Sequence, residues 1–343
     1  YIITVPTPIN KKNKPDIRQL ISSTKIVSHY INQNNLVIYE STVYPGLIEE
    51  ISKRYLEKKN FKLNKNFILG YSPERINPGD KKRKIENINK LVSASNEEGL
   101  NKMYKIYSSF MKAKVIKVSS IKVAEAAKVI ENTQRDVNIA LTNEFSLIFN
   151  KLGIDSDQVF TAASTKWNFI KEFRPGLVGG HCIGVDPYYL AEKAINIGLN
   201  PKLILAGRDL NNKMYRIIGN RILKIHFKKH KKKPNVLMLG ITFKKNCSDI
   251  RNSQLIKLHS FLKKKSSKVY LFDKIAKIDK KNREKFSIKL SNNLNFINKV
   301  DIIVVGVNHK YTSSILKKFL KKIKNNAFVF QIEKAIDFKN KLE

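Results

Sequence analysis

The sequence predicts an α/β protein in which two α/β regions flank a helical region. Strand-like and helix-like segments alternate from residue 1 to about residue 120, and the alternation returns after about residue 229. Such alternation is typical of a mostly parallel sheet covered by helices. The stretch between these regions carries almost no strand pattern. We therefore expect three domains, which cover residues 1–120, 121–228 and 229–343.

The first region reads as a series of short strands and helices. It opens on a β-branched run that ends at Pro6 and Pro8. Because a buried parallel strand normally has neighbours on both sides, we expect this domain to begin upstream of Tyr1. Further strands are expected at residues 35–42, 66–74, 89–95 and 113–119, and helices at residues 16–33, 45–58 and 96–111.

The helical region is dominated by one long periodic pattern at residues 121–152, which allows at most one break. A helical region between two α/β regions suits a dimer interface, so we expect a homodimer. Shorter helices are expected at residues 156–163, 188–197 and 201–227, with an irregular loop at residues 166–187. The last region has strands at residues 235–241, 268–273, 300–307 and 327–332, and a helix at residues 253–264.

The formal charge of +38 is the most unusual overall property of the chain. Only 11 of the 66 basic residues are arginines, and lysines are scattered through every segment. We therefore interpret the charge as a solvated surface and not as a nucleic-acid site. Two cysteines cannot build a disulfide framework, which favours the reducing cytoplasm. No apolar run approaches the roughly 18 residues of a membrane span, and the six histidines show no metal-ligand spacing.

Lys128 and Asn132 are the first candidates for a catalytic site. They lie four residues apart, on one face of the long helix. Neighbours such as Val129 and Ile130 are apolar, so we expect the helix to be well covered and Lys128 to face a polar cavity or a partner. A lysine held there can stabilise a developing oxyanion. The alternative is an ordinary solvated helix face.

Two predicted strand ends offer further candidates, Glu74 and Thr42. Ligands of open α/β sheets bind at the carboxyl ends of strands, which is where both residues are expected. The alternative for Glu74 is a loop carboxylate that pairs with Arg75. The alternative for Thr42 is a hydroxyl that caps the helix that follows.

Cys182 lies in the glycine-rich stretch GGHCIGVDPYY, residues 179–189, with Asp186 four residues later. Glycines allow left-handed turns and the close approach of another molecule. This cysteine is therefore more reachable than the average cysteine, which is a small buried hydrophobe. By itself the stretch fits a structural turn and a catalytic loop equally well.

The loop after the first strand of the last region carries Phe243, Lys244 and Arg251. A phosphate or nucleotide is expected at this place in such a sheet. Arg251 is the strongest of the three candidates because arginine is scarce here, whereas we interpret Cys247 as structural. No G-x-G-x-x-G follows the strand, so this region lacks a dinucleotide fingerprint.

Together these stretches resemble the UDP-glucose/GDP-mannose dehydrogenase family over nearly the whole chain. The following motifs occur in the family's order: PTP, ESTVYPG, SPERINPGD, KVIENTQRDVNIALTNE, TKWNF, FRPGLVGGHCIGVDPYY, AGRDLNN and TFKKNCSDIRNS. They are most similar to the branch that acts on UDP-N-acetylglucosamine or UDP-N-acetylgalactosamine in Vi-antigen and O-antigen synthesis. The resemblance implies two Rossmann-like domains joined by a central helical dimerisation region. It also implies a cytoplasmic, NAD-dependent 6-dehydrogenase that serves surface polysaccharide biosynthesis.

The resemblance also implies roles for individual residues. Cys182 would capture the C6 aldehyde as a thiohemiacetal, in an alcohol-to-acid oxidation that uses two NAD and passes through a thioester. Oxyanion stabilisation is implied for Lys128 and Asn132, water and proton handling for Asp186 and Thr42, and general-base hydrolysis for Glu74. Substrate contacts are implied for Phe173, Arg174, Gly179, Gly180, Arg208, Phe243 and Lys244, and cofactor contacts for Thr7, Thr42 and Arg251.

One departure from the family is large, because the family's G-x-G-x-x-G and the acidic residue that holds the adenosine ribose are absent. At about 30 residues per βα unit, about 60–90 residues would precede Tyr1. We therefore expect a truncated NAD-binding domain, and a chain that alone binds the UDP-sugar but has no dehydrogenase activity. The alternative is an inactive remnant that binds UDP-sugar or dimerises without catalysis.

Overall fold

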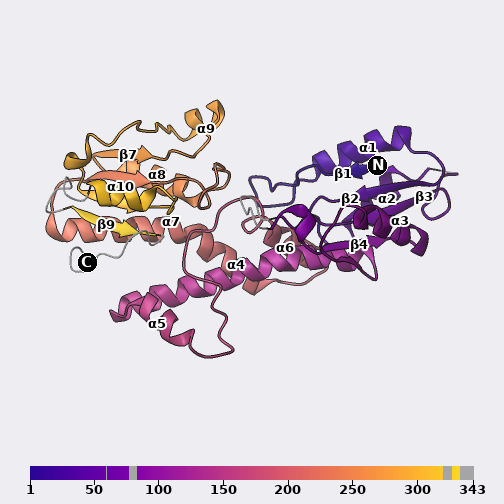
Figure 1. Cartoon of the computed structure of the whole chain (residues 1–343), viewed down its shortest axis with the longest axis horizontal. Coiled ribbons are helices and arrows are strands. Elements are labelled where there is room, and N and C mark those ends of the chain that lie inside the picture. The colour runs from indigo at the N-terminus through magenta and orange to yellow at the C-terminus, as the bar shows by residue number, and fades with distance from the viewer. Residues whose placement is uncertain (59, 77–82, 320–326, 333–343) are drawn as a thin grey trace. The chain divides into compact units, whose positions relative to one another are not determined.

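The structure, a computed structural model, describes residues 1–343 apart from residues 59, 77–82, 320–326 and 333–343 (Figure 1). The chain forms two compact units. The first comprises Tyr1–Arg135 and Val185–Leu205, and the second comprises Asp136–Gly184 and Ala206–Glu343. Within the described part of the chain, no helix is both long and apolar enough to cross a membrane.

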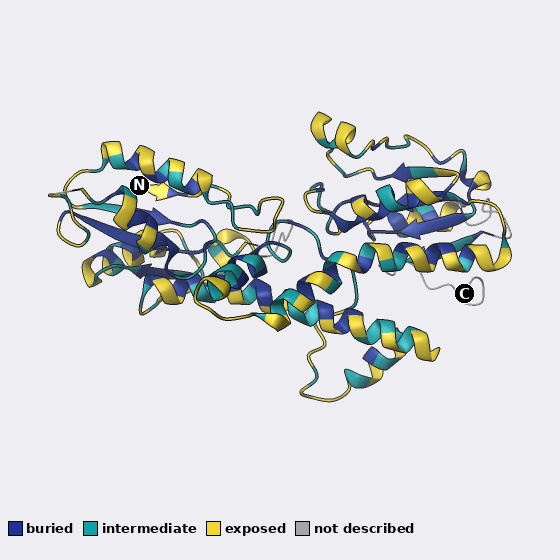
Figure 2. Cartoon of the chain, turned by 180° about the vertical axis from the view of Figure 1, so that it is seen from behind, coloured by how far each residue is buried: buried dark blue, intermediate teal, exposed yellow. Residues whose placement is uncertain are grey.

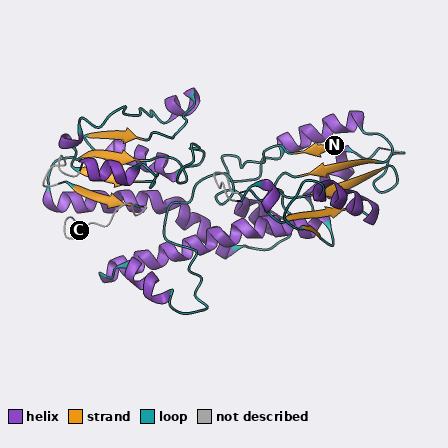
Figure 3. Ribbon diagram, in the orientation of Figure 1, coloured by secondary structure: helices purple, strands orange, loops and turns teal. Residues whose placement is uncertain are grey.

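The first unit is built on a five-stranded sheet with the order β1-β2-β3-β4-β5 (Figure 3). Neighbouring strands are parallel except β3 and β4, which are antiparallel. The strands are β1 (Ile2–Ile3), β2 (Asn35–Tyr39), β3 (Phe67–Tyr71), β4 (Lys90–Ala94) and β5 (Val115–Lys117). The carboxyl ends of β1, β2 and β3 therefore meet at one edge of the sheet.

The helices of the first unit pack against this sheet or against one another, and its central strands are buried. These helices are α1 (Arg18–Tyr30), α2 (Leu47–Tyr55), α3 (Glu97–Ser108), the first part of α4 (Ile121–Leu152) and α6 (Asp186–Asn196). Every residue of β3 is buried (Figure 2). Gly70 in β3 allows α3 to pack closely, because an added Cβ would lie 2.3 Å from Sδ of Met103.

Helix α2 receives its cap from a distant glutamate. Gly46 at the N-cap has a left-handed backbone, with φ of 92°, and no side chain to offer. Glu125 of α4 is fully buried and accepts hydrogen bonds from the backbone N–H groups of Gly46 and Ile48, at 2.5 and 3.0 Å. Burial raises the pKa of Glu125 to about 7, although both hydrogen bonds act to lower it. The alternative in which Thr42 caps this helix is therefore wrong.

The second unit holds a parallel sheet with the order β7-β6-β8-β9. Its strands are β6 (Asn235–Leu239), β7 (Lys268–Phe272), β8 (Ile302–Val305) and β9 (Phe328–Gln331). Its helices include α5 (Ser156–Ala163), most of α7 (Lys202–Lys229), α8 (Gln254–Lys265), α9 (Lys280–Lys285) and α10 (Thr312–Phe319). Alternate residues of β6, such as Met238 and Leu239, enter two different apolar clusters. Both faces of the sheet are therefore covered, which explains the continuous apolar strands.

Most of the elements that the sequence predicts are present, and the differences have local causes. Helix α4 is continuous, without the break that the sequence allowed. The opening run forms only the short strand β1, which stops before Pro6. Ile130 is 53% exposed, so α4 is less covered than expected, although Lys128 is only 4% exposed. Helices α9 and α10 were not predicted. The lysine-rich α9 has no buried residue and hence no apolar periodicity to reveal it.

Asp273, directly after β7, ties several segments of the second unit together. Its carboxylate accepts hydrogen bonds from the backbone N–H groups of Ile241, Ile275 and Ala276, at 2.9 to 3.0 Å. The fully buried His309 places Nε2 at 3.3 Å from the same carboxylate. Burial acts to raise the pKa of Asp273, but His309 and the backbone N–H groups lower it to about 2.

We expect Asp273→Asn to lower the free energy of unfolding by about 2 kcal/mol at neutral pH. A carboxyl whose folded pKa is depressed contributes stability above its unfolded pKa, and this contribution is lost as the pH falls from about 4 to about 2. Urea titrations across this range should show a loss in the parent that is absent from Asp273→Asn. The exposed Asp209 serves as a control, and Asp209→Asn should behave like the parent. An equal loss in Asp273→Asn and the parent would refute the assignment.

Candidate active site

In the first unit, Lys128, Asn132 and Asp186 form a buried polar cluster. Asn132 donates a hydrogen bond of 2.6 Å from Nδ2 to Oδ2 of Asp186, the first residue of α6. All three side chains are at most 6% exposed. Val129 of α4 packs with Tyr189 of α6 and holds the two helices together. The structure therefore brings together three of the residues that the sequence singled out.

The carboxyl of Asp186 has a pKa that lies close to neutral pH. Burial raises its pKa to about 6, while Lys128 and Asn132 act to lower it. The carboxylates of Glu74 and Glu131 also act to raise it, so both contribute to the electrostatics of the cluster. A group with such a pKa can accept and return a proton near neutral pH, which is what general acid–base catalysis requires.

Glu74 follows β3 and is half-buried. Its carboxylate accepts a hydrogen bond from the backbone N–H of Ile76. The alternative pairing with Arg75 is wrong, because Arg75 forms an ion pair with Glu131 at 2.6 Å and donates to the carbonyl of Asn89 at 3.0 Å. The rest of the predicted SPERINPGD loop falls in residues 77–82, outside the described residues.

Hydroxyl groups join the carboxyl ends of β1 and β2. Thr7 donates from Oγ1 to the carbonyl of Thr42 at 2.7 Å, and Ser41 donates from Oγ to the carbonyl of Val5 at 2.6 Å. The structure thus places Thr7 and Thr42, both expected at a cofactor, side by side at one edge of the sheet.

Glu40, Lys90 and Tyr107 form a second buried cluster, which sequence reasoning missed. Nζ of Lys90 lies 3.3 Å from Oε1 of Glu40 and donates to the carbonyls of Pro73 and Ser72 at 3.3 and 3.4 Å. The hydroxyl of Tyr107 donates to Glu40. Lys90 therefore anchors the segment that leads from β3 to the candidate base. The sequence signal that could have revealed this cluster was Lys90, a charged residue at the start of a strand that was predicted to be buried.

In the second unit, glycines explain the shape of the loop that carries Cys182. Gly180 has a left-handed backbone, with φ of 85°. An added Cβ at either Gly179 or Gly180 would lie 2.9 Å from Phe243. Two hydrogen bonds of 3.2 and 3.1 Å fasten the backbone of Gly180 to residues 251–252. Cys182 itself is half-buried, and no disulfide joins the two cysteines.

Arg251 lies beside this loop. Its guanidinium forms an ion pair with Asp249 at 2.6 Å, and this hydrogen bond raises the pKa of Arg251. Cys182 and Cys247 also raise it through their charge, so both thiols lie within electrostatic range of the guanidinium. A cation near a cysteine favours the thiolate, which is the nucleophilic form.

Arg208 is buried within the second unit. Nη1 donates to Asp136 at 2.6 Å, and Nη2 donates to Asn212 at 2.6 Å. An added Cβ at Gly184 would lie 4.0 Å from both terminal nitrogens. The guanidinium therefore lies against the backbone two residues after Cys182.

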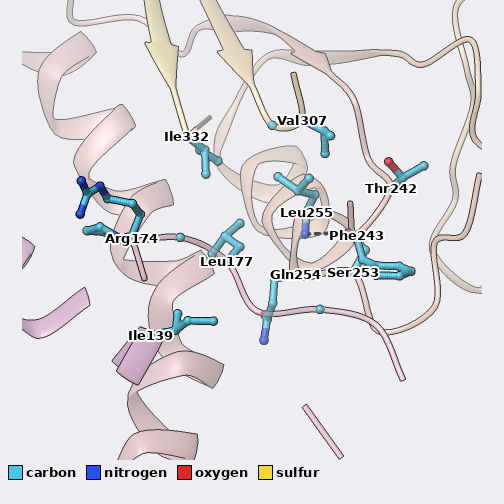
Figure 4. Close-up of a pocket in the computed structure, with 14 residues that line it drawn as sticks. Ile139, Arg174, Leu177, Thr242, Phe243, Ser253, Gln254, Leu255, Val307 and Ile332 are labelled. Carbon is cyan, nitrogen blue, oxygen red and sulfur yellow. Dashed lines mark hydrogen bonds between the residues drawn. The ribbon is translucent and has the colours of Figure 1, made fainter. Parts of the chain in front are cut away.

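A pocket of about 280 Å³ lies at the carboxyl ends of β6, β8 and β9 (Figure 4). Helix α8 begins at this pocket, and the N–H groups of a helix start suit an anionic ligand. Of the predicted substrate residues, Arg174, Gly179 and Phe243 line the pocket, whereas Phe173, Gly180, Arg208 and Lys244 do not. Over the residues that the structure describes, no group of three or more His, Cys, Asp or Glu side chains could hold a metal ion.

Two α/β units, with polar groups at the strand ends of one and a strand-end pocket in the other, are typical of a nucleotide-binding enzyme. The chain belongs to the UDP-glucose/GDP-mannose dehydrogenase family. The family's NAD binding domain matches residues 1–111, its central domain residues 122–213 and its UDP binding domain residues 237–338. The protein is therefore a dehydrogenase with NAD as its cofactor.

Individual relatives agree with this assignment. The UDP-N-acetyl-D-glucosamine 6-dehydrogenase of Salmonella typhi is 48% identical over 90% of this chain and 73% of its own length. The enzyme of the same name from Pseudomonas aeruginosa is 49% identical over 80% of this chain and 65% of its own length. The solved structure of a UDP-D-ManNAc dehydrogenase from Pyrococcus horikoshii has a TM-score of 0.84 and 26% identity, over 98% of this chain and 78% of its own.

The described residues fit only part of an NAD molecule. Thr7 and Thr42 lie at adjoining strand ends, where the hydroxyl of Thr7 is bonded to the carbonyl of Thr42 and joins the two ends. Pyrophosphate binding relies on a glycine turn at the start of a helix, and the sequence contains no G-x-G-x-x-G. The strand ends of this chain suit a nucleotide ligand, but the glycine turn that would hold the pyrophosphate of NAD is not among its residues.

We expect Gly180→Ala to weaken UDP binding about tenfold or more. Alanine is strained in the left-handed backbone that this position adopts, and its Cβ would crowd Phe243. Gly153→Ala is the matched control, because Gly153 also has a left-handed backbone, with φ of 72°, but an added Cβ there has nothing within 4 Å and Gly153 does not line the pocket. Calorimetric titration with UDP and thermal unfolding of both variants would measure the effect. If Gly180→Ala binds UDP as tightly as Gly153→Ala, Gly180 does not shape the nucleotide site.

Proposed function

We propose that the chain oxidises C6 of a UDP-N-acetylhexosamine to a carboxylate, with UDP-N-acetylglucosamine as its substrate. The observation that carries the proposal is the buried cluster in which Asn132 binds Asp186 beside Lys128. A cation, an amide donor and a carboxyl with a pKa near 6 are the groups needed to stabilise an oxyanion and move a proton. Two relatives that are nearly half identical carry the name UDP-N-acetyl-D-glucosamine 6-dehydrogenase, which supports the substrate.

The proposed reaction passes through a covalent bond to Cys182. NAD, when bound, accepts a hydride in each of the two oxidations. The alcohol loses a hydride from carbon and a proton from oxygen, which leaves an aldehyde. The thiolate of Cys182 adds to the aldehyde carbon, and the oxygen takes up a proton to give a thiohemiacetal. Loss of a second hydride and of that proton gives a thioester, and attack by water breaks the C–S bond and releases the acid.

The other residues of the cluster have roles in charge and proton handling. Lys128 and Asn132 stabilise the negative oxygen of the tetrahedral adducts. Asp186, supported by its pKa of about 6, exchanges protons with the reacting oxygen and with water, together with Thr42. Glu74 is the base that activates water for hydrolysis, and its position beyond β3 within the field of Asp186 supports this role. Arg251 favours the thiolate of Cys182.

The nucleotide part of the substrate occupies the second unit in this proposal. Arg174, Gly179 and Phe243 support it most directly, because they line the strand-end pocket. Further contacts to the sugar nucleotide are assigned to Phe173, Gly180, Arg208 and Lys244. Cofactor contacts are assigned to Thr7, Thr42 and Arg251. Production of UDP-linked uronic acids for surface polysaccharides, in the cytoplasm, is the corresponding cellular role.

A homodimer through the helical region also belongs to the proposal. On the second half of α4, Leu141, Ile148 and Leu152 are 46%, 47% and 64% exposed. Residues three to four apart share a helix face, and seven apart they recur on it. An apolar row of this kind suits a second copy of the chain.

The double substitution Leu141→Asp and Ile148→Asp should convert a dimer to a monomer in light scattering after size exclusion. Both side chains are about half exposed, so the loss of stability in the monomer should be small. A parent that is already monomeric would refute the dimer, and a doubly substituted chain that remains dimeric would refute this face of α4 as its interface.

Cys182→Ala should reduce formation of the uronic acid by about three orders of magnitude or more, because no thiohemiacetal can form. Cys182→Ser should be nearly as damaging, since an alcohol ionises far less readily than a thiol. Cys247→Ser, the matched control at the other cysteine, should keep the parent's rate. Mass spectrometry of the product from UDP-N-acetylglucosamine and NAD would measure the effect, with the family's G-x-G-x-x-G unit fused ahead of Tyr1 in the parent and in each variant. Acid formation by Cys182→Ala at the parent's rate would disprove the covalent route.

Lys128→Met should lower kcat by about two to three orders of magnitude while UDP-sugar binding changes little. The reason is that the lysine acts on charge that develops during the reaction. Steady-state kinetics of the parent and the variant, each fused to the family's G-x-G-x-x-G unit, and calorimetric titration with UDP-N-acetylglucosamine would separate the two effects. A change confined to KM would make Lys128 a binding residue and not a catalytic one.

A further inference from the structure

A buried polar network in the second unit connects α4, α7 and residues 176–184, which we call the cysteine loop because they contain Cys182. Asn211 donates from Nδ2 to both Oδ1 and the backbone carbonyl of Asp136, at 2.8 and 2.9 Å. Its Oδ1 accepts a hydrogen bond of 2.9 Å from Nδ2 of Asn143. Asp136, Asn143 and Asn211 are all fully buried. The proposed reaction assigns none of these three side chains a role.

Asn143 binds the start of the cysteine loop through both backbone polar groups of Gly176, its N–H and its carbonyl. Its Oδ1 accepts a hydrogen bond of 2.8 Å from the N–H of Gly176, and its Nδ2 donates to the carbonyl of the same glycine at 3.1 Å. Two bonds to one residue fix its orientation as well as its position. An added Cβ at Gly176 would touch nothing within 4 Å, so close packing does not take over this restraint.

The same network also reaches the other side of Cys182. Asp136 binds Arg208 at 2.6 Å, and the guanidinium of Arg208 lies against Gly184. The segment is thus fixed by hydrogen bonds six residues before the cysteine, and the guanidinium of Arg208 lies near it two residues after the cysteine. Buried hydrogen bonds are costly to leave unmade, so this network keeps the loop in one conformation.

We propose that Asn143 is a positioning residue for Cys182, which fixes the cysteine loop through Gly176 and so limits the access of reagents to the thiol. The catalytic meaning of this role rests on the proposed function of Cys182 as the nucleophile. Asn143 itself does not line the strand-end pocket.

The test compares the two cysteines within one molecule. The full chain is alkylated with iodoacetamide well below its melting temperature, and peptide mass spectrometry follows Cys182 and Cys247 separately. In Asn143→Leu, which has a similar volume without hydrogen-bonding groups, Cys182 should react about fivefold faster or more than in the parent. Cys247 should keep its rate to within about twofold. Asn143→Asp retains the acceptor for the N–H of Gly176 and should give an intermediate rate at Cys182.

Thr142→Val is the matched control, because the neighbouring buried hydroxyl donates only to the carbonyl of Ile139. It should leave both rates unchanged. Equal acceleration of both thiols in Asn143→Leu would show general loosening and overturn the positioning role. An unchanged rate at Cys182 in either Asn143 variant that remains folded would overturn it as well. The result is independent of turnover, so it stands or falls separately from the effect of Cys182→Ser on acid formation.

Discussion

The cost of burying a polar group without a partner constrains helix α4 more than any other element. This helix carries charged and amide side chains inward at several turns, and each of them is removed from water. Their partners are the segments that build the candidate site. Glu125 binds the start of α2, Asn132 binds the start of α6, Asp136 binds α7, and Asn143 binds the cysteine loop. The position of these segments therefore depends on the order of polar residues along one helix.

The sequence predicted most of the fold because the relevant signals are local. The bounds of α4 and α5 follow from apolar periodicity, and the strands of both sheets follow from short apolar runs. The four-residue spacing of Lys128 and Asn132 correctly placed both on one buried face. Helix α9 was not predicted, because none of its residues is buried and its sequence therefore has no apolar periodicity.

The contacts that could not be predicted join residues far apart in the chain. Glu125 caps a helix whose N-cap residue, Gly46, lies 79 residues earlier, whereas the sequence rules for caps consider only nearby side chains. Arg75 forms its ion pair with Glu131 and not with its neighbour Glu74. Lys90 pairs with Glu40 and lies over the ring of Tyr107. In each case the choice depends on which segments the fold brings together, and no local pattern encodes that.

Asp273 bears on how the two sheets could have diverged in evolution. In dinucleotide-binding sheets, a carboxylate beyond the early strands serves the ribose hydroxyls of the ligand. Here the corresponding carboxylate is occupied by three backbone N–H groups and by His309. Recovery of ribose binding at this position would require the loop after β6, the turn after β7 and the histidine to change together. Single substitutions along such a path would each leave a buried polar group without a partner, at a cost of about 1–3 kcal/mol. In the C-terminal sheet, the hydrogen bonds of Asp273 therefore keep its carboxylate from a ribose, in addition to the absence of a glycine turn after β6.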